Sequence, residues 1–310
     1  EVAPDPARIH DRTGILFSVA GVSNSFIITI YISLFTTRSD MKYYVLTFSI
    51  FSLISACQKK EGALNKFHDP TITIVADLQD RRSSDSILLY LKHANSTYRG
   101  AAALAFASIQ DSNYVQPLRN VLLSDDDPQV RMAAAYAIGQ TFSLQSEEIL
   151  FEASARESDG QVLAEIIRAY GKVARKWKLK ITPRDSITAI ALGWGYYRMA
   201  VRGVSDNELN NRAGELLRSA HSPARLAASH YFARGAKDFD RFEKLLSTLA
   251  VAENLADVRM AATLALGKIN SDSSLFTLIT VAKEDPDDRV RTNAIRSLQN
   301  FGFDQSREAL

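Results

Sequence analysis

Between residues 71 and 303, short segments with helical apolar spacing alternate with brief polar breaks. In the segments 98–110, 130–140 and 256–269, apolar residues recur three and four positions apart, as they do along one face of an α-helix. Most of them are alanines, which favour helix and let neighbouring helices approach closely. The breaks carry Asp, Asn, Ser and Pro, residues that start helices. The pattern predicts an all-α region built of short paired helices.

The breaks return at a regular interval. The residues that occupy the same position after each turn are Arg99, Arg131, Leu163, Arg225, Arg259 and Arg291. Consecutive members are 32, 32, 62, 34 and 32 positions apart, and 62 is close to two periods. Such a period is typical of a stacked array, because one helical hairpin cannot bury both of its faces. We therefore predict an α-solenoid over 71–303, a right-handed superhelix of stacked helical hairpins. Residues 304–310 begin a further, truncated repeat.

The pattern loosens between residues 175 and 220. A basic linker over 176–183 precedes a long apolar helix over 185–202, which we interpret as a diverged repeat. Aromatic and basic side chains gather here, and both are favoured where proteins bind one another. The candidate partner-binding residues are Trp177, Trp194, Tyr196, Tyr197, Arg198 and Arg202. In the alternative interpretation, Trp194 and Tyr197 fill core space left by missing alanines.

The best-defined units resemble a known family. Two segments resemble HEAT repeats: Asp-Pro-Gln-Val-Arg-x-x-Ala-Ala-x-Ala-Ile-Gly at 127–139 and Ala-Asp-Val-Arg-x-x-Ala-x-x-Ala-Leu-Gly at 256–267. They most closely resemble the bacterial subclass once grouped with phycobilisome lyases. In that family a turn aspartate and a helix arginine form a ladder between units. The resemblance implies a ladder that breaks at Leu163 and across 175–220. Its implied pairs are Asp127 with Arg131, Asp287 or Asp288 with Arg291, and more loosely Asp257 with Arg259.

The front of the chain has the layout of an export signal. Residues 41–56 contain a methionine, a lysine and an apolar run, followed by the only cysteine, Cys57. The stretch Ile54-Ser55-Ala56-Cys57 resembles the bacterial lipobox, which implies lipidation at Cys57 and a place in the cell envelope. Gln58 favours the outer membrane. The alternative is a short buried helix that ends in cysteine.

Two flanking segments complete the expected organisation. Residues 57–70 are polar and predict a tether between the lipid and the array. Residues 1–40 are expected to be a spurious or disordered upstream extension, with a membrane-spanning helix over 14–35 as the alternative.

A closer likeness is to lipoproteins of the Bacteroidetes, in which a lipobox precedes a segment such as Lys66-Phe67-His68-Asp69-Pro70 and alanine-rich HEAT units. In some of these relatives a cyclophilin-type prolyl isomerase follows the array. This chain carries no cyclophilin sequence, so that activity would lie beyond Leu310.

Histidine and cysteine, which serve catalytic and metal sites in many proteins, are few in this sequence. No two histidines are spaced for a helical metal site, and one cysteine excludes an internal disulfide. A net charge of +2 is too small for bulk attraction to nucleic acid. We therefore expect a non-catalytic scaffold without cofactor or metal, which binds protein on its concave face and the membrane through Cys57. The alternatives are the scaffold part of a prolyl isomerase and a lyase-like chromophore handler.

Overall fold

The computed structural model describes residues 15–22, 25–32 and 68–302, which belong to two separate units. In the first unit, strands β1 (Ile15–Val22) and β2 (Ser25–Ile32) pair antiparallel, with Ile15 opposite Ile32. The described part of 14–35 is therefore strand, and not the spanning helix of the alternative interpretation. No described helix combines the length and apolar character needed to cross a bilayer. The expected signal segment, Cys57 and the residues after 302 lie outside the described residues.

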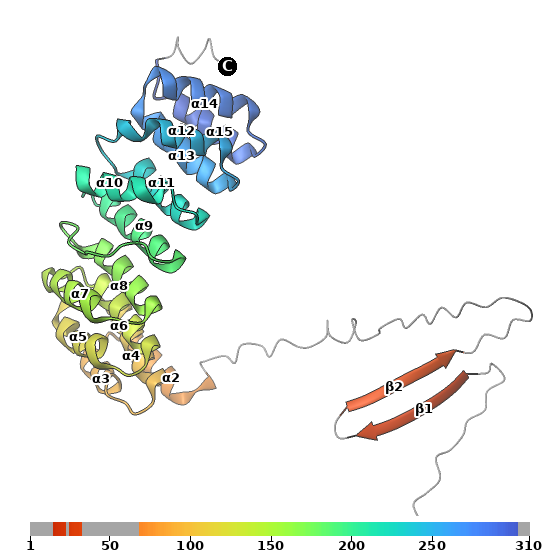
Figure 1. Ribbon diagram of the computed structural model, residues 1–310. Helices are drawn as coiled ribbons and strands as arrows, with labels where there is room; N and C mark the ends of the chain where they lie inside the picture. Colours follow the sequence, from red (N-terminus) through yellow and green to blue (C-terminus); the bar gives the residue numbers. More distant parts are fainter. Residues whose placement is uncertain (1–14, 23–24, 33–67, 303–310) are drawn as a thin grey trace, which may run out of the picture. The chain divides into compact units, whose positions relative to one another are not determined.

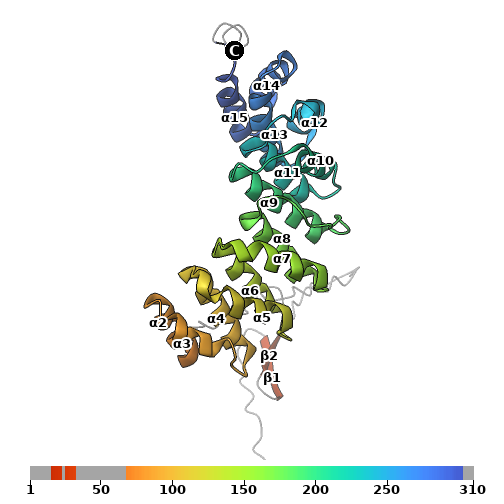
Figure 2. The same cartoon turned by 90° about the vertical axis from the view of Figure 1, so that its left-hand side faces the viewer.

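Between residues 68 and 302 all regular elements of the second unit are helices, and they form two rows (Figures 1 and 2). The inner row consists of α2 (Pro70–Asp80), α4 (Ser96–Ile109), α6 (Pro128–Gln140), α8 (Gly160–Val173), α9 (Ser186–Val201), α11 (Ser222–Arg234), α13 (Ala256–Ile269) and α15 (Asp288–Leu298). The outer row consists of α3 (Ser84–Tyr90), α5 (Val115–Ser124), α7 (Leu144–Arg156), α10 (Asn207–Leu216), α12 (Glu243–Ala252) and α14 (Asp272–Glu284). Short 3₁₀ turns η3 (Ser112–Tyr114) and η4 (Asp240–Phe242) lead into α5 and α12.

The inner helices form a continuous stack. Each packs on the next, from α4 through α6, α8, α9, α11 and α13 to α15. Their contact faces are buried alanines such as Ala102, Ala134 and Ala262, so neighbouring backbones come close. The predicted α-solenoid is confirmed over the described residues 68–302, because its repeating hairpins share one continuous hydrophobic core.

One outer helix is missing from the row. The unit of α9 begins with residues 174–185, which run without helix beside α7. Along this segment Lys176, Lys178 and Lys180 are exposed, whereas Trp177 and Leu179 between them are buried. Because alternate side chains of an extended chain point to opposite sides, one face of the segment covers the core that an outer helix covers elsewhere.

Glycines bring the inner helices closest on both sides of α9. A Cβ built on Gly171 of α8 would lie 2.3 Å from the carbonyl oxygen of Gly195 in α9. One on Gly193 would lie 2.7 Å from the Cβ of Ala227 in α11. Only glycine permits these approaches, so the row stays tightly packed where its outer cover changes.

Candidate partner-binding surface

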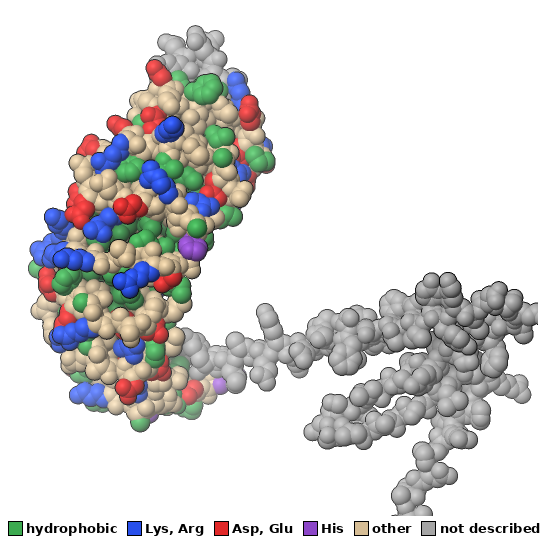
Figure 3. Space-filling view, in the orientation of Figure 1, with side chains coloured by type: hydrophobic (Ala, Val, Ile, Leu, Met, Phe, Trp, Pro, Cys, Tyr) green, Lys and Arg blue, Asp and Glu red, His purple; other side chains and the backbone are tan. Residues whose placement is uncertain are grey.

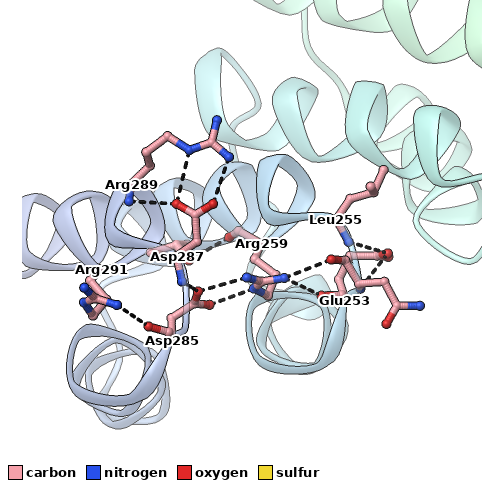
Figure 4. Close-up of polar contacts among 9 residues, drawn as sticks. Glu253, Leu255, Arg259, Asp285, Asp287, Arg289 and Arg291 are labelled. Carbon is pink, nitrogen blue, oxygen red and sulfur yellow. Dashed lines mark hydrogen bonds and ion pairs between the residues drawn. The ribbon is translucent and has the colours of Figure 1, made fainter.

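Arginines at the start of the inner helices connect consecutive units. Arg259 of α13 donates from Nε and Nη2 to the two carboxylate oxygens of Asp285, at 2.7 and 2.9 Å (Figure 4). Its Nη1 donates to the main-chain oxygen of Glu253, in the loop of its own unit, at 2.8 Å. The side chains of Arg259 and Asp285 are only 9% and 4% exposed. The planar guanidinium thus fixes one loop against the next by a bidentate contact that lysine cannot make.

The same arrangement occurs three more times. The pairs are Arg99 with Asp125 at 2.7 Å, Arg131 with Glu157 at 2.9 Å, and Arg225 with Glu253 at 2.5 Å. In each, Nη1 of the arginine also donates to the carbonyl six residues upstream. We call these four pairs the arginine ladder. It forms two runs, one from Arg99 to Glu157 and one from Arg225 to Arg291, whose Nη1 donates to the Asp285 carbonyl.

The ladder keeps its four carboxyl groups ionised. The hydrogen bond from Arg225 is the main reason why the pKa of Glu253 is lowered. For Asp125, Glu157 and Asp285, burial by itself would raise the pKa, but hydrogen bonds from the arginine and from loop amides outweigh it, and the pKa is lowered. One such amide is that of Asp287, which donates to Asp285 at 2.9 Å. Protonation of these groups would therefore oppose folding.

The ladder uses a different acidic residue from the one expected at 127. Asp127 is the N-cap of α6, and its Oδ1 accepts from the amide of Gln129 at 2.8 Å. The ladder partner in this turn is Asp125, which ends α5 two positions earlier. The expected contact between the Asp127 and Arg131 side chains is thus replaced by the pair Arg131–Glu157.

The two later pairs also differ from expectation. Asp257 lies 3.3 Å from Arg289 of the next inner helix, and Arg259 pairs with Asp285 instead. Asp288 does meet Arg291, at 2.8 Å, but the two are three residues apart in one helix, and Asp288 is exposed. That contact therefore does not link two units. The expected break is present, because Leu163 cannot donate and the second run starts only at Arg225.

A sequence signal for the ladder acids exists. When one unit has a ladder arginine, the following unit has an acidic residue six positions before its own residue at the arginine position. These acidic residues are Asp125, Glu157, Glu253 and Asp285. Where the preceding inner helix has none, the position holds His93 or Ser219. Acid and arginine thus occur together across a unit boundary, which identifies the pair.

Three of the expected partner-binding residues have structural roles. Trp177 and Tyr196 are 5% and 2% exposed, and their rings meet edge to face with centroids 4.6 Å apart. The indole Nε1 of Trp177 donates to the Leu179 carbonyl at 3.1 Å. Arg202 is exposed, but it donates to the carbonyl of Ala174 at 2.9 Å, at the end of α8. Trp177 and Tyr196 are therefore core residues and not part of a binding surface.

The other aromatic candidates are accessible. Trp194 and Tyr197 lie on α9, half-buried, with ring centroids 5.4 Å apart. His230 of α11 completes the group, stacked on Trp194 at 5.6 Å and edge-on to Tyr197 at 5.9 Å. Tyr197 packs partly buried against the core, as the alternative interpretation expects of it, while Trp177 and Tyr196 lie within the core. We call Trp194, Tyr197 and His230 the aromatic cluster.

Positive side chains flank the aromatic cluster. Arg198 follows Tyr197 on α9, and its Nη1 is buried without a hydrogen-bond partner among the described residues. On α8, Lys172 donates to Gln140 at 3.2 Å and its Nζ lies 4.3 Å from the ring centroid of Tyr136. Burial lowers the pKa of Arg198 and of Lys172, and for Lys172 the charge of Arg198 adds to the effect. The charged forms of both groups are therefore poorly compensated within the chain.

A second basic region lies in the outer row. Figure 3 shows Lys and Arg side chains gathered at the height of α8 and α9, at the left edge of the molecule. Here Lys178 meets the buried carboxylate of Glu147 at 3.0 Å, and Arg175 meets it at 3.2 Å. This region is thus partly neutralised by contacts that secure residues 174–185 to α7.

The described residues offer no site for metal-dependent chemistry, since no group of three or more His, Cys, Asp or Glu among them could hold an ion. The arrangement can instead present a binding surface: a row of inner helices, fixed by the arginine ladder and by glycine contacts, with aromatic rings and cations at its centre.

Fold and site together define a helical-repeat protein with an exposed inner face. The sequence matches the family described as HEAT repeats over residues 84–171 and 211–299, which is more than half of the chain. The chain therefore belongs to the HEAT-repeat family. The interval between the two matches contains α9 and the segment that replaces its outer helix.

Solved structures match this chain at low sequence identity and with TM-scores below 0.5. Human deoxyhypusine hydroxylase in complex with glycerol is 18% identical, with a TM-score of 0.32, and the match covers 73% of this chain and 88% of that one. An engineered protein, target OR497, is 17% identical with a TM-score of 0.48, covering 74% of this chain and 70% of that one. The search of curated proteins finds no match.

Proposed function

We propose that this chain is a non-catalytic scaffold that binds a partner protein on its inner helices. The observation that carries the proposal is the aromatic cluster of Trp194, Tyr197 and His230, which is partly exposed near the middle of the inner row. Tryptophan and tyrosine supply much of the binding energy in protein interfaces, because they bury large rigid surfaces at little entropic cost.

Burial elsewhere in the array supports this choice. The cluster Tyr170, Trp177 and Tyr196 and the cluster Tyr231, Phe232 and Phe242 are buried and serve the core. The exposed part of the Trp194 ring is not covered by the described part of this chain, and a partner molecule could cover it. The ladder holds the flanking helices in register, so the surface is ready before the partner arrives.

The test compares two single substitutions of exposed apolar side chains. Trp194→Ala removes the centre of the aromatic cluster, and Phe276→Ala removes a side chain on the outer helix α14 that is 73% exposed. Purified wild-type protein and both variants would be used to capture partners from envelope extracts of the source cells, and each captured protein would be purified and titrated. We expect a partner that binds the wild type and Phe276→Ala, and that loses at least about tenfold in affinity for Trp194→Ala. A partner that binds all three equally would contradict the proposal.

The proposal includes a lipid anchor at Cys57 and an outer-membrane location. It is supported by Ile54-Ser55-Ala56-Cys57, with an apolar run before it and a polar stretch behind it. Two acyl chains or more would hold the protein stably on a membrane, because each buried methylene contributes about 0.8 kcal/mol. The test is incorporation of a labelled fatty acid into wild type and into Cys57→Ser, with fractionation of inner and outer membranes. Equal labelling of both proteins would exclude Cys57 as the site.

A further inference from the structure

The inner face carries more positive than negative charge around the aromatic cluster. Lys172, Arg198, Arg234 and Lys268 lie on α8, α9, α11 and α13, and among the described residues none of the four makes an ion pair. They lie on four consecutive inner helices, each packed on the next. Within this row the charge of Arg198 acts on Lys172, and that of Arg234 acts on both His230 and Lys268. We call these four residues the inner cation row.

The acidic residues nearby are already engaged. Glu165 pairs with Arg168 at 2.9 Å on α8, and Asp257 pairs with Arg289 at 3.3 Å. Neither makes an ion pair with the inner cation row, although the charge of Glu165 favours the charged forms of Lys172 and Arg198. By contrast, each of the four ladder arginines has a carboxylate partner.

We infer that the partner segment that docks on this face is an extended acidic peptide, whose carboxylates meet the inner cation row while an apolar or aromatic side chain covers Trp194. This inference rests on the proposed function and adds the chemistry of the partner. The geometry that supports it is the guanidinium of Arg198, whose Nη1 is buried without an acceptor among the described residues, on the same helix as the partly exposed Trp194. The Arg198 side chain is itself partly exposed, so a carboxylate that binds its accessible part would compensate a charge that lacks an ion pair within the described residues.

The spacing of the row sets the length of the segment. Neighbouring packed helices lie about 9 Å apart, so three steps from α8 to α13 span roughly 27 Å. An extended peptide covers about 3.3 Å per residue, and about eight residues therefore reach from Lys172 to Lys268.

The same face disfavours nucleic acid. A phosphate backbone carries a charge at every nucleotide and binds where basic side chains follow it without interruption. Here Glu165 and Asp257 lie among the cations, and the net charge of the chain is only +2. A peptide can place its carboxylates beside the cations and neutral residues beside Glu165 and Asp257.

The first test measures the sign of the local potential without any partner. The chain has two tryptophans, so Trp177→Phe leaves Trp194 as the sole reporter. We expect iodide to quench its fluorescence at least about twofold better than caesium, because the nearby cations attract the anion. Replacing Arg234 and Lys268 by glutamine should reduce this preference. Equal quenching, or better quenching by caesium, would overturn the inference.

The second test titrates labelled peptides of about eight residues. One alternates glutamate with glycine around a central phenylalanine, and the matched peptide has glutamine in place of glutamate. We expect the acidic peptide to bind at least about tenfold more tightly, and to lose that preference in Lys172→Gln/Arg198→Gln and in Arg234→Gln/Lys268→Gln. The control is Lys176→Gln/Lys180→Gln, which removes two exposed charges from the outer segment and should change nothing. Circular dichroism melts confirm that each variant is folded.

The outcomes separate this inference from the proposed function. If a captured partner needs Trp194 but binds the two charge variants normally, the scaffold proposal holds and the acidic partner is wrong. If a single-stranded oligonucleotide binds more tightly than the acidic peptide, with strong salt dependence, the inference is also overturned. If the acidic peptide binds but no captured partner depends on Trp194, the proposed function is contradicted while the preference of this face for acidic peptides remains.

Discussion

Arg225 and Glu253 are 28 residues apart in the chain, yet the arginine holds both carboxylate oxygens of the glutamate, at 2.5 and 2.8 Å. The main-chain oxygen of the same Glu253 accepts from Nη1 of Arg259 at 2.8 Å. One residue thus receives arginine contacts from two successive units. Neighbouring rungs of the ladder are therefore coupled through a shared loop, and loss of one rung should loosen the next.

Removing an internal arginine of the ladder should cost more stability than removing the terminal one. Arg259→Leu leaves Asp285, which is 4% exposed, without its counter-ion, and we expect a loss of about 3 kcal/mol. Arg291→Leu is the matched control, because its guanidinium meets only the exposed Asp288 and a carbonyl, and a loss of about 1 kcal/mol or less is expected. Urea midpoints measure both values. Equal losses would show that the ladder adds nothing beyond single hydrogen bonds.

The array should lose stability in acid. The pKa of Glu253 is lowered by Arg225, and the net pKa of Asp125, Glu157 and Asp285 is lowered as well. Because their folded pKa values lie below those of the unfolded chain, the stabilisation is complete above the unfolded values, from about pH 5 upward, and is lost as the pH falls through the folded values. Urea midpoints between neutral pH and about pH 3 should fall steeply for wild type. In Arg259→Leu the dependence should be weaker, since Asp285 no longer has its arginine.

Glycine contacts at α9 should tolerate no side chain. Gly171→Ala would place a Cβ 2.3 Å from the Gly195 carbonyl oxygen, so two helix backbones must separate. We expect a loss of about 1–3 kcal/mol, as for other overpacked cores. Gly160→Ala, at the first residue of α8, meets nothing within 4 Å and should be neutral or stabilising by about 0.4–1 kcal/mol. Thermal and urea unfolding of the two variants would decide the matter.

Truncation of the two tryptophans should reduce stability to very different extents. Trp177→Ala removes a buried indole from the core of the irregular unit, and we expect a loss of about 3–5 kcal/mol. Trp194→Ala removes a partly exposed side chain and should cost about 1 kcal/mol or less. The readout is the free energy of unfolding from urea titration. A large loss for Trp194→Ala would mean that its ring belongs to the core and would undermine the proposed binding surface.

The helices were predictable because their signals are local. Apolar spacing, alanine content and capping residues act within a few positions, so the expected helix over 256–269 coincides with α13 (Ala256–Ile269). The solenoid followed from the period, since equal units stack in equal ways.

The contacts between units were harder to predict from the sequence. Asp125, Asp126 and Asp127 stand in one run, and sequence alone does not say which carboxylate caps α6 and which points to Arg99. The structure assigns the cap to Asp127, because the N-cap position brings its carboxylate to the amide of Gln129. That leaves Asp125 for the ladder.

The burial of Trp177 had a signal that the linker interpretation did not use. Lys176-Trp177-Lys178-Leu179-Lys180 alternates polar and apolar residues with period two, which is typical of an extended segment with one buried side. Tyr196 was harder to place, because α9 is apolar on most of its surface and its outer cover is not a helix. Which of its aromatic residues face solvent depends on residues 174–185.

That extended cover gives the chain a natural point of division. Lys176, Lys178 and Lys180 offer trypsin several bonds, while the Trp177 and Leu179 side chains between them stay embedded. The backbones of α8 and α9 remain in contact through Gly171 and Gly195 whether or not the covering segment is intact. A protease that cuts there would leave two complementary halves joined as one particle, and the same two polypeptides, made separately, should reassemble.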